Sequence, residues 1–100
     1  NLFYRSGIRS VSETLFIVCL PETELETRRW ANELRENGKN VEVYLDSSVE
    51  LGKQIKYAAK RGYKTIILPL EEAWKKGQVE VKNLETGQQE AVKRGEIAHG

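Results

Sequence analysis

Short apolar runs separated by amphipathic stretches form the clearest pattern along these 100 residues. Residues 14–20 and 65–68 are mainly apolar at successive positions, and Pro21 and Pro69 close the two runs. Apolar character on both faces predicts strands that are covered on both sides, as in the centre of a parallel sheet. Residues 41–45 alternate between apolar and polar instead, which predicts a third strand with one wetter face.

An amphipathic helix is predicted after the first strand. Thr23 and Glu26 have the spacing of a capping box, so the helix is expected to run from there to about residue 37. Gly38 then provides a left-handed stop. Four residues at helical spacing are expected to form its buried face: Thr27, Trp30, Ala31 and Leu34.

A second amphipathic helix is predicted to start at residues 46–48, where Ser47 and Glu50 form another capping box. Gly62 is expected to end it. The predicted buried stripe consists of Leu51, Ile55, Ala58 and Ala59.

The last third of the chain predicts a short helical turn at residues 71–76 and then a β-hairpin. Residues 78–84 and 88–92 flank Glu85-Thr86-Gly87, with glycine at the tight position. The predicted fold is therefore an α/β domain with a mixed five-stranded sheet. Its order is β-α-β-α-β followed by a short helix and an antiparallel hairpin, with the helices packed on the sheet. The domain is expected to span residues 14–100, after a polar linker or the tail of a preceding element at residues 1–13.

Composition is that of an ordinary soluble globule, with 39% hydrophobic and 31% charged residues. The apolar run at residues 15–20 is far shorter than a membrane span, so no membrane partner is expected. Residues 1–9 lack the apolar centre of a signal peptide, and a cytoplasmic location is expected. Cys19 is the single cysteine and lies within the apolar run, so a buried thiol is predicted.

Charge is unevenly distributed although the net charge is only +1. Residues 1–50 carry 6 basic and 9 acidic side chains, a net of −3, and residues 51–100 carry 10 basic and 6 acidic, a net of +4. A basic second half is compatible with contact to RNA.

Catalytic and cofactor motifs are missing from the sequence. No glycine-rich phosphate loop follows the strand at residues 14–20, which argues against a nucleotide- or flavin-binding enzyme. The single histidine, His99, and the single cysteine cannot form a metal-ligand cluster. No catalytic residue, cofactor site or metal site is therefore expected in this chain.

Two surfaces carry candidate nucleic-acid chemistry. Lys53, Lys56, Tyr57 and Lys60 follow helical spacing, which puts three amines and one aromatic ring on one face. Amines neutralise phosphates and an exposed ring stacks on bases, although a plain solvated helix face has the same pattern. On the first hairpin strand, Lys82 lies on the face opposite the apolar positions, where it can read base edges or simply discourage edge aggregation.

Three segments resemble the C-terminal anticodon-binding domain of class II aminoacyl-tRNA synthetases, most closely the histidyl type. Residues 51–62, LGKQIKYAAKRG, resemble its GKQ-x-KYA-x-K-x-G helix. Residues 79–89, VEVKNLETGQQ, resemble its V-x-VKNL-x-TGEQ hairpin. Residues 33–38, followed by 41–43, are similar to its LR-x-x-G-x-x-VE element. The resemblance extends over about residues 14–92.

The resemblance implies a domain that recognises the anticodon stem-loop of a tRNA and positions the tRNA for a separate catalytic domain. It implies a parent histidyl-tRNA synthetase that is a homodimeric, ATP-dependent ligase, with ATP and magnesium bound only in the parent catalytic domain. Lys82 matches a basic strand position that contacts anticodon bases in this superfamily. Together with the helix pattern, the expected tRNA-binding residues are Lys53, Gln54, Lys56, Tyr57, Lys82, Asn83 and Thr86.

The sequence departs from the family pattern after the strand at residues 65–68. The family has I-G-E-x-E there, whereas this chain has Leu70 at the glycine and Ala73 at the second acid. Either Glu72 replaces that acid or base reading is altered. The alternative function is accordingly a degenerate synthetase-like domain that serves as a protein-interaction or regulatory module.

Overall fold

The computed structural model describes residues 14–99, so the expected linker at residues 1–13 lies outside the described residues. The side chain of His99 also lies outside the description. The elements, in chain order, are β1 (Leu15–Ile17), η2 (Pro21–Thr23), α2 (Glu24–Glu36), β2 (Val41–Val43), α3 (Leu51–Arg61), β3 (Thr65–Leu68), α4 (Glu71–Lys75), β4 (Gln78–Asn83), β5 (Gln89–Lys93) and α5 (Arg94–His99).

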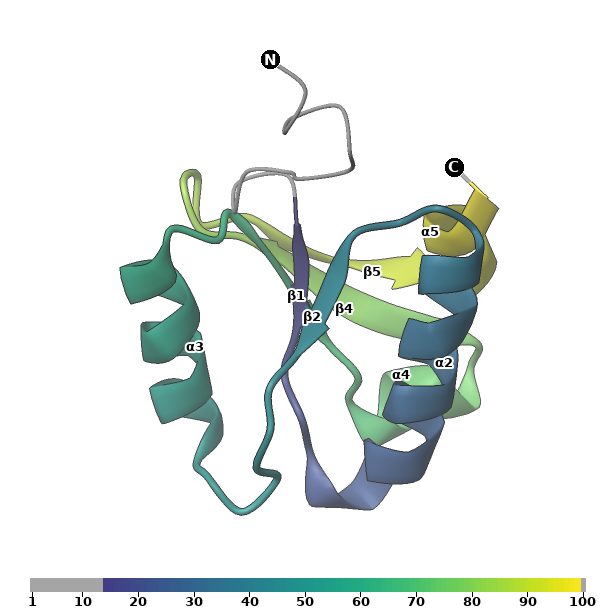
Figure 1. Cartoon of the computed structure of the whole chain (residues 1–100), viewed down its shortest axis with the longest axis horizontal. Helices are drawn as coiled ribbons and strands as arrows, with labels where there is room; N and C mark the ends of the chain where they lie inside the picture. The colour runs from purple at the N-terminus through teal and green to yellow at the C-terminus, as the bar shows by residue number, and fades with distance from the viewer. Residues whose placement is uncertain (1–13, 100) are drawn as a thin grey trace, which may run out of the picture.

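The strands form one mixed sheet in the order β2-β1-β3-β4-β5. β1 is parallel to both β2 and β3, and β4 is antiparallel to β3 and β5. The connection through α2 and the connection through α3 cross the sheet in opposite directions, so right-handed crossovers place the two helices on opposite faces. α3 alone covers one face, and α2, α4 and α5 lie on the other (Figure 1). The predicted α/β fold is confirmed.

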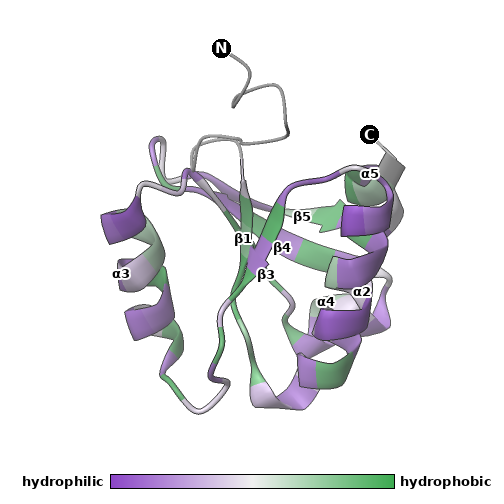
Figure 2. Ribbon diagram, in the orientation of Figure 1, coloured by the Kyte–Doolittle hydropathy of each residue, from purple (hydrophilic) through white to green (hydrophobic). Residues whose placement is uncertain are grey.

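Each face of the sheet has its own hydrophobic core. On the α2 side, Ile17, Ile67 and Val79 pack with Trp30 and other residues of α2. The α3 side is built by alternate positions of the same central strands and by α3: Phe16, Val18, Ala58, Ile66 and Leu68. β1 and β3 are therefore covered on both faces, as their continuous apolar runs predict, and the hydropathy colouring shows apolar strands between helices with polar outer surfaces (Figure 2).

The predicted buried face of α2 is confirmed, because Thr27, Trp30, Ala31 and Leu34 are all buried. The stripe predicted for α3 is confirmed for Ala58, which is buried, and for Leu51 and Ile55, which are partly buried against the core, but it is wrong for Ala59, which is exposed. Gln54 occupies the buried position instead, three residues after Leu51, where one turn of helix returns to the same face.

Both predicted capping boxes are wrong, since neither helix has a side-chain cap. The Thr23 hydroxyl donates to the carbonyl oxygen of Pro69 at 2.7 Å. α3 begins at Leu51 rather than at residues 46–48, and Ser47 Oγ donates to Glu24 Oε1 at 2.9 Å. In each case an acceptor distant in sequence takes the hydroxyl that the local pattern assigned to a cap.

The hairpin forms as predicted, and it is followed by a helix that the sequence did not predict. α5 has only six residues and includes Gly95, so it lacks a periodic apolar stripe of useful length. It is held by tertiary contacts, because Ala98 and Ile97 join the α2-side core. Within residues 14–99, no helix combines the length and apolar character needed to cross a membrane.

Candidate nucleic-acid interface

The hairpin side of the α3-side face of the sheet has no helix over it. α3 packs against β1 and β3, whereas the same face of β4 and β5 is open (Figure 1). Register places Lys82 beside Ile66 on that face and opposite Gln89 on β5. The open hairpin face consists of Gln78, Glu80 and Lys82 on β4 and Gln89, Ala91 and Lys93 on β5. This face offers charges, amides and one small side chain on a platform that no helix covers.

The predicted lysine ridge of α3 lies beside this platform. Lys53 and Lys56 are exposed, together with Lys60. At 100° per residue these three side chains point almost directly away from the partly buried Leu51 and the buried Ala58. Because α3 and the open hairpin face belong to the same side of the sheet, the structure places Lys53, Lys56 and Lys82 on one side of the molecule.

Tyr57 lies on the flank of α3 that faces β2, away from the hairpin. Its ring centroid is 5.3 Å from that of Tyr44 and 6.0 Å from that of Phe16. The Arg61 guanidinium carbon lies 5.6 Å from the Tyr57 centroid. With 40% of its surface exposed, Tyr57 is partly accessible as predicted, but the structure does not bring it together with Lys82.

Gln54 does not belong to the polar face, and its prediction as an exposed tRNA contact is wrong. Its side chain is fully buried, with 0% of its surface exposed. Oε1 accepts the Cys19 amide at 2.7 Å, while Nε2 donates to the carbonyl oxygens of Cys19 and Val49 at 2.8 and 2.9 Å. Gln54 therefore ties α3 to the segment after β1, where backbone groups need partners.

Asn83 and Thr86 shape the hairpin turn. Asn83 Oδ1 accepts the backbone amides of Glu85 and Thr86 at 2.8 and 3.1 Å. Thr86 Oγ1 accepts the amide of Gln88 at 3.2 Å, and Gly87 has φ +79°. Asn83 follows Lys82 directly and Thr86 lies at the tip of the same hairpin, but the side-chain oxygens of both residues stabilise the turn.

A shallow groove of about 470 Å³ lies at the other end of the open hairpin face, against α4. Leu70 and Ala73, the two positions that depart from the family pattern, both line it. Its charged lining residues are Glu22, Glu71, Glu72, Lys76 and Glu80. The groove is therefore acidic, and its carboxylates can accept hydrogen bonds from amino groups of bases but repel phosphates. No group of three or more His, Cys, Asp or Glu side chains within residues 14–99 is placed to hold a metal ion.

Sequence reasoning missed the two glutamines of the open hairpin face. Gln78 lies opposite Lys93, and Gln89 lies opposite Lys82 and donates to Glu80 Oε1 at 3.2 Å. The signal was present in the hairpin pattern. With the turn fixed at Gly87, alternation along both strands assigns Gln78 and Gln89 to the Lys82 face.

Comparison with known proteins defines the class. A family model described as "Anticodon binding domain" matches residues 14–100, and the chain belongs to this family. Its relatives include the histidine–tRNA ligase of Methanococcus maripaludis, 33% identical over 89 residues that make up 86% of this chain and 21% of the relative. The histidine–tRNA ligase of Listeria innocua is 40% identical over 82 residues, 80% of this chain and 19% of the relative. The chain is thus an anticodon-binding domain of the histidyl-tRNA synthetase type, and it spans about a fifth of the length of these relatives.

Solved structures share the fold. The histidyl-tRNA synthetase of a Nostoc species superimposes with a TM-score of 0.76, covering 97% of this chain and 24% of that chain at 20% identity. The RNA binding domain of threonyl-tRNA synthetase from Cryptosporidium parvum gives 0.75, covering 88% of this chain and 22% of that chain at 13% identity. The histidyl enzyme, the threonyl RNA binding domain and this chain thus share one α/β architecture.

Proposed function

We propose that this chain binds the anticodon stem-loop of a tRNA as the C-terminal domain of a histidyl-tRNA synthetase. One observation carries the proposal beyond the family match. The lysine ridge of α3 and the open hairpin face lie next to each other on the same side of the sheet. They carry the two best-matched motifs. Lys53 and Lys56 supply amines on this side, and Lys82 supplies a basic group on the hairpin.

The two parts of this surface have different tasks. Lys53, Lys56 and Lys60 neutralise phosphates of the stem-loop, because amines on an exposed helix contact the backbone without reading sequence. Lys82 and Gln89 face the unpaired anticodon bases, whose hydrogen-bonding edges are accessible when the bases are unstacked. Asn83 and Thr86 act by holding the turn that positions Lys82.

The acidic groove receives a base edge. Glu72 replaces the acid that Ala73 lacks, since both residues line the same groove and Glu72 is exposed. A carboxylate there accepts a hydrogen bond from an amino group of a base, which favours some bases over others. Loss of discrimination at one anticodon position in Glu72→Gln, with phosphate contacts intact, is the expected result.

The remaining proposals concern the whole protein. Aminoacylation with histidine, and the ATP and magnesium that it requires, belong to a separate catalytic domain. The whole protein assembles as a homodimer in the cytoplasm. Under this proposal the domain described here positions the tRNA for that catalytic domain. An upstream sequence with class II catalytic motifs would support this assignment.

Titration of a labelled histidine anticodon stem-loop with this chain tests the proposal. The double variant Lys53→Ala/Lys56→Ala is expected to weaken binding to every RNA sequence equally. Because each released phosphate contact contributes roughly 0.7–0.9 to the slope of log Kd against log salt, the slope is expected to fall by about 1.5. The control Arg29→Ala removes one exposed charge from α2, on the opposite face, and should leave the slope unchanged.

Lys82→Gln tests base reading. It is expected to reduce the preference for the histidine anticodon over a scrambled anticodon by about tenfold, equivalent to about 1.4 kcal/mol. Wild-type binding that ignores the anticodon would refute the recognition part of the proposal, and absence of binding at low salt would refute the RNA part.

A protein-interaction role is the second candidate, and Leu70 and Ala73 favour it because they remove two family features from the groove. Light scattering on the purified chain distinguishes the two functions. A monomer that binds the stem-loop with anticodon preference supports tRNA recognition, whereas self-association without RNA binding supports the second candidate.

A further inference from the structure

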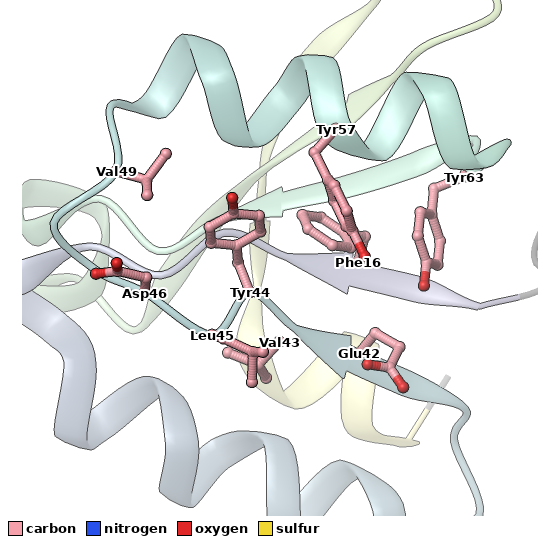
Figure 3. Close-up of a pocket in the computed structure, with 9 residues that line it drawn as sticks. All are labelled: Phe16, Glu42, Val43, Tyr44, Leu45, Asp46, Val49, Tyr57 and Tyr63. Atoms are coloured by element: carbon pink, nitrogen blue, oxygen red, sulfur yellow. The ribbon is translucent and has the colours of Figure 1, made fainter.

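An aromatic groove of about 410 Å³ lies between β2 and α3, on the side of α3 that faces away from the hairpin. It forms because α3 packs over β1 and β3 and leaves the adjacent face of β2 uncovered. Figure 3 shows its walls, with Tyr57 and Tyr63 descending from the α3 side toward β2, and with Tyr44 and Glu42 rising from the strand side.

Four aromatic rings form one continuous wall of this aromatic groove. The Phe16 centroid lies 4.9 Å from Tyr63, 6.0 Å from Tyr57 and 6.2 Å from Tyr44. Tyr44 and Tyr57 meet edge to face at 5.3 Å with an interplanar angle of 79°. These contacts fix the rings, so the groove presents preformed π-surface. Leu45, 87% exposed, lies at the rim with its side chain pointing away from the rings (Figure 3).

The charged residues that line the aromatic groove are both acidic, Glu42 and Asp46. Burial is the largest cause that raises the pKa of Tyr63, and the negative charge of Glu42 raises it further. Arg61 lies outside the lining, stacked over Tyr57 at 5.6 Å, and shows that this ring accepts a guanidinium.

These features do not suit the ligands considered so far. Carboxylates at the groove repel the phosphates that the lysine ridge attracts. Addition of a further strand to β2 is hindered, because arginines occupy one outward carbonyl group within β2 and one just beyond its end. Arg35 donates to the carbonyl oxygen of Val41 at 3.2 Å, and Arg28 donates to that of Leu45 at 3.3 Å.

We propose that the aromatic groove binds an arginine side chain presented by a partner polypeptide. A guanidinium is flat and weakly hydrated, stacks on tyrosine, and offers paired donors to a carboxylate. Glu42 accepts the paired donors, Tyr44 contacts the guanidinium plane, and Tyr57, whose ring is nearly perpendicular to that of Tyr44, closes one side of the site. The inference concerns a different surface from the tRNA proposal and stands independently of it.

Nuclear magnetic resonance titration of the ¹⁵N-labelled chain with N-acetyl-arginine amide tests this assignment. Saturable shifts are expected at residues 42–46 and 57–63, with a Kd of about 1 mM, as is typical of a single side chain. N-acetyl-citrulline amide has the same shape without the charge and is expected to give no saturable shift. Equal shifts with both compounds would refute a cation site.

Variants separate charge from structure. Glu42→Gln is expected to weaken binding by about tenfold, whereas the control Glu36→Gln removes an exposed acid from α2 and should leave it unchanged. Tyr44→Phe keeps the ring and should retain binding, and Tyr44→Leu should lose it. If Tyr44→Leu binds as well as wild type while its amide spectrum remains folded, the aromatic site is refuted.

Discussion

At the scale of single residues, the Gln54 side-chain amide makes the hydrogen bonds to peptide groups that a neighbouring strand would otherwise make. It supplies an acceptor and two donors to peptide groups that follow β1 and precede α3. No neighbouring strand provides these partners, because β2 has already diverged toward its loop. Gln54, which the helix pattern marks as polar and exposed, is thus a buried residue that holds the fold together.

Replacement of Gln54 by leucine should therefore destabilise the domain strongly. It leaves the Cys19 amide and two carbonyl oxygens without partners, so the free energy of unfolding is expected to fall by about 3 kcal/mol or more. Urea denaturation measures this change. The control Gln88→Leu, at an exposed position in the turn, should change stability by less than about 0.5 kcal/mol. Equal effects at both positions would contradict the role assigned to Gln54.

Asp46 has a lowered pKa because the hydroxyl of Ser48 and then its backbone amide donate to the carboxylate, at 2.6 and 2.9 Å. A lowered folded-state pKa means that the carboxylate stabilises the fold above its ordinary pKa of about 3.9, and that this contribution is lost as pH falls below it. Ser48→Ala should move the Asp46 pKa up toward its ordinary value in a carboxyl titration followed by nuclear magnetic resonance. Ser47→Ala, whose hydroxyl donates to Glu24 instead, should leave that pKa in place.

At the scale of elements, the hairpin depends on one backbone conformation. Gly87 has φ +79°, which a side chain disfavours, and its amide donates to the carbonyl oxygen of Asn83 at 2.8 Å. Gly87→Ala is expected to lower the free energy of unfolding by about 1–2 kcal/mol. Gly52→Ala, in the first turn of α3 with open space around the added carbon, should instead raise it by about 0.5 kcal/mol. Thermal denaturation of both variants checks the pair, and destabilisation by Gly52→Ala alone would contradict it.

The spacing of apolar residues predicted the order and type of these elements reliably, because burial against the core determines which positions are apolar. The runs around Phe16 and Ile67, the face of α2 and the glycine-centred hairpin could all be predicted from sequence. The start of α2 after Thr23 was also predictable, but the capping contacts and the start of α3 were not, since the hydroxyls of Thr23 and Ser47 found partners that only the folded chain brings close. α5 is likewise held by tertiary packing rather than by its own pattern.

The candidate interface was predictable in part for the same reason. Helical spacing located Lys53 and Lys56, and strand alternation located Lys82. Gln54 was misplaced because a polar side chain was assumed to face solvent, whereas buried backbone groups required it. The aromatic groove could not be predicted, because its four rings come from separate segments of the chain that lie together only after folding.

At the scale of the whole molecule, the sheet has a protected centre and exposed margins. β1 and β3 are paired on both sides and covered on both faces, while β2 and β5 are edges. Amides of β1 and β3 are therefore expected to exchange with solvent most slowly, through global unfolding, and those of β5 much faster. Hydrogen exchange followed by nuclear magnetic resonance measures this order. Protection in β5 equal to that in β3 would show that the hairpin does not open separately.

The two arginines that donate to carbonyl groups at the β2 edge of the sheet affect how easily such a domain can be joined to different proteins. Arg28 and Arg35 come from α2 within the same domain, so two carbonyl groups at this edge have partners without help from any neighbour. A host chain that acquires the domain need not evolve a surface to shield it. Self-sufficiency of this kind makes a module transplantable, and it suits a unit that forms about a fifth of each much longer relative.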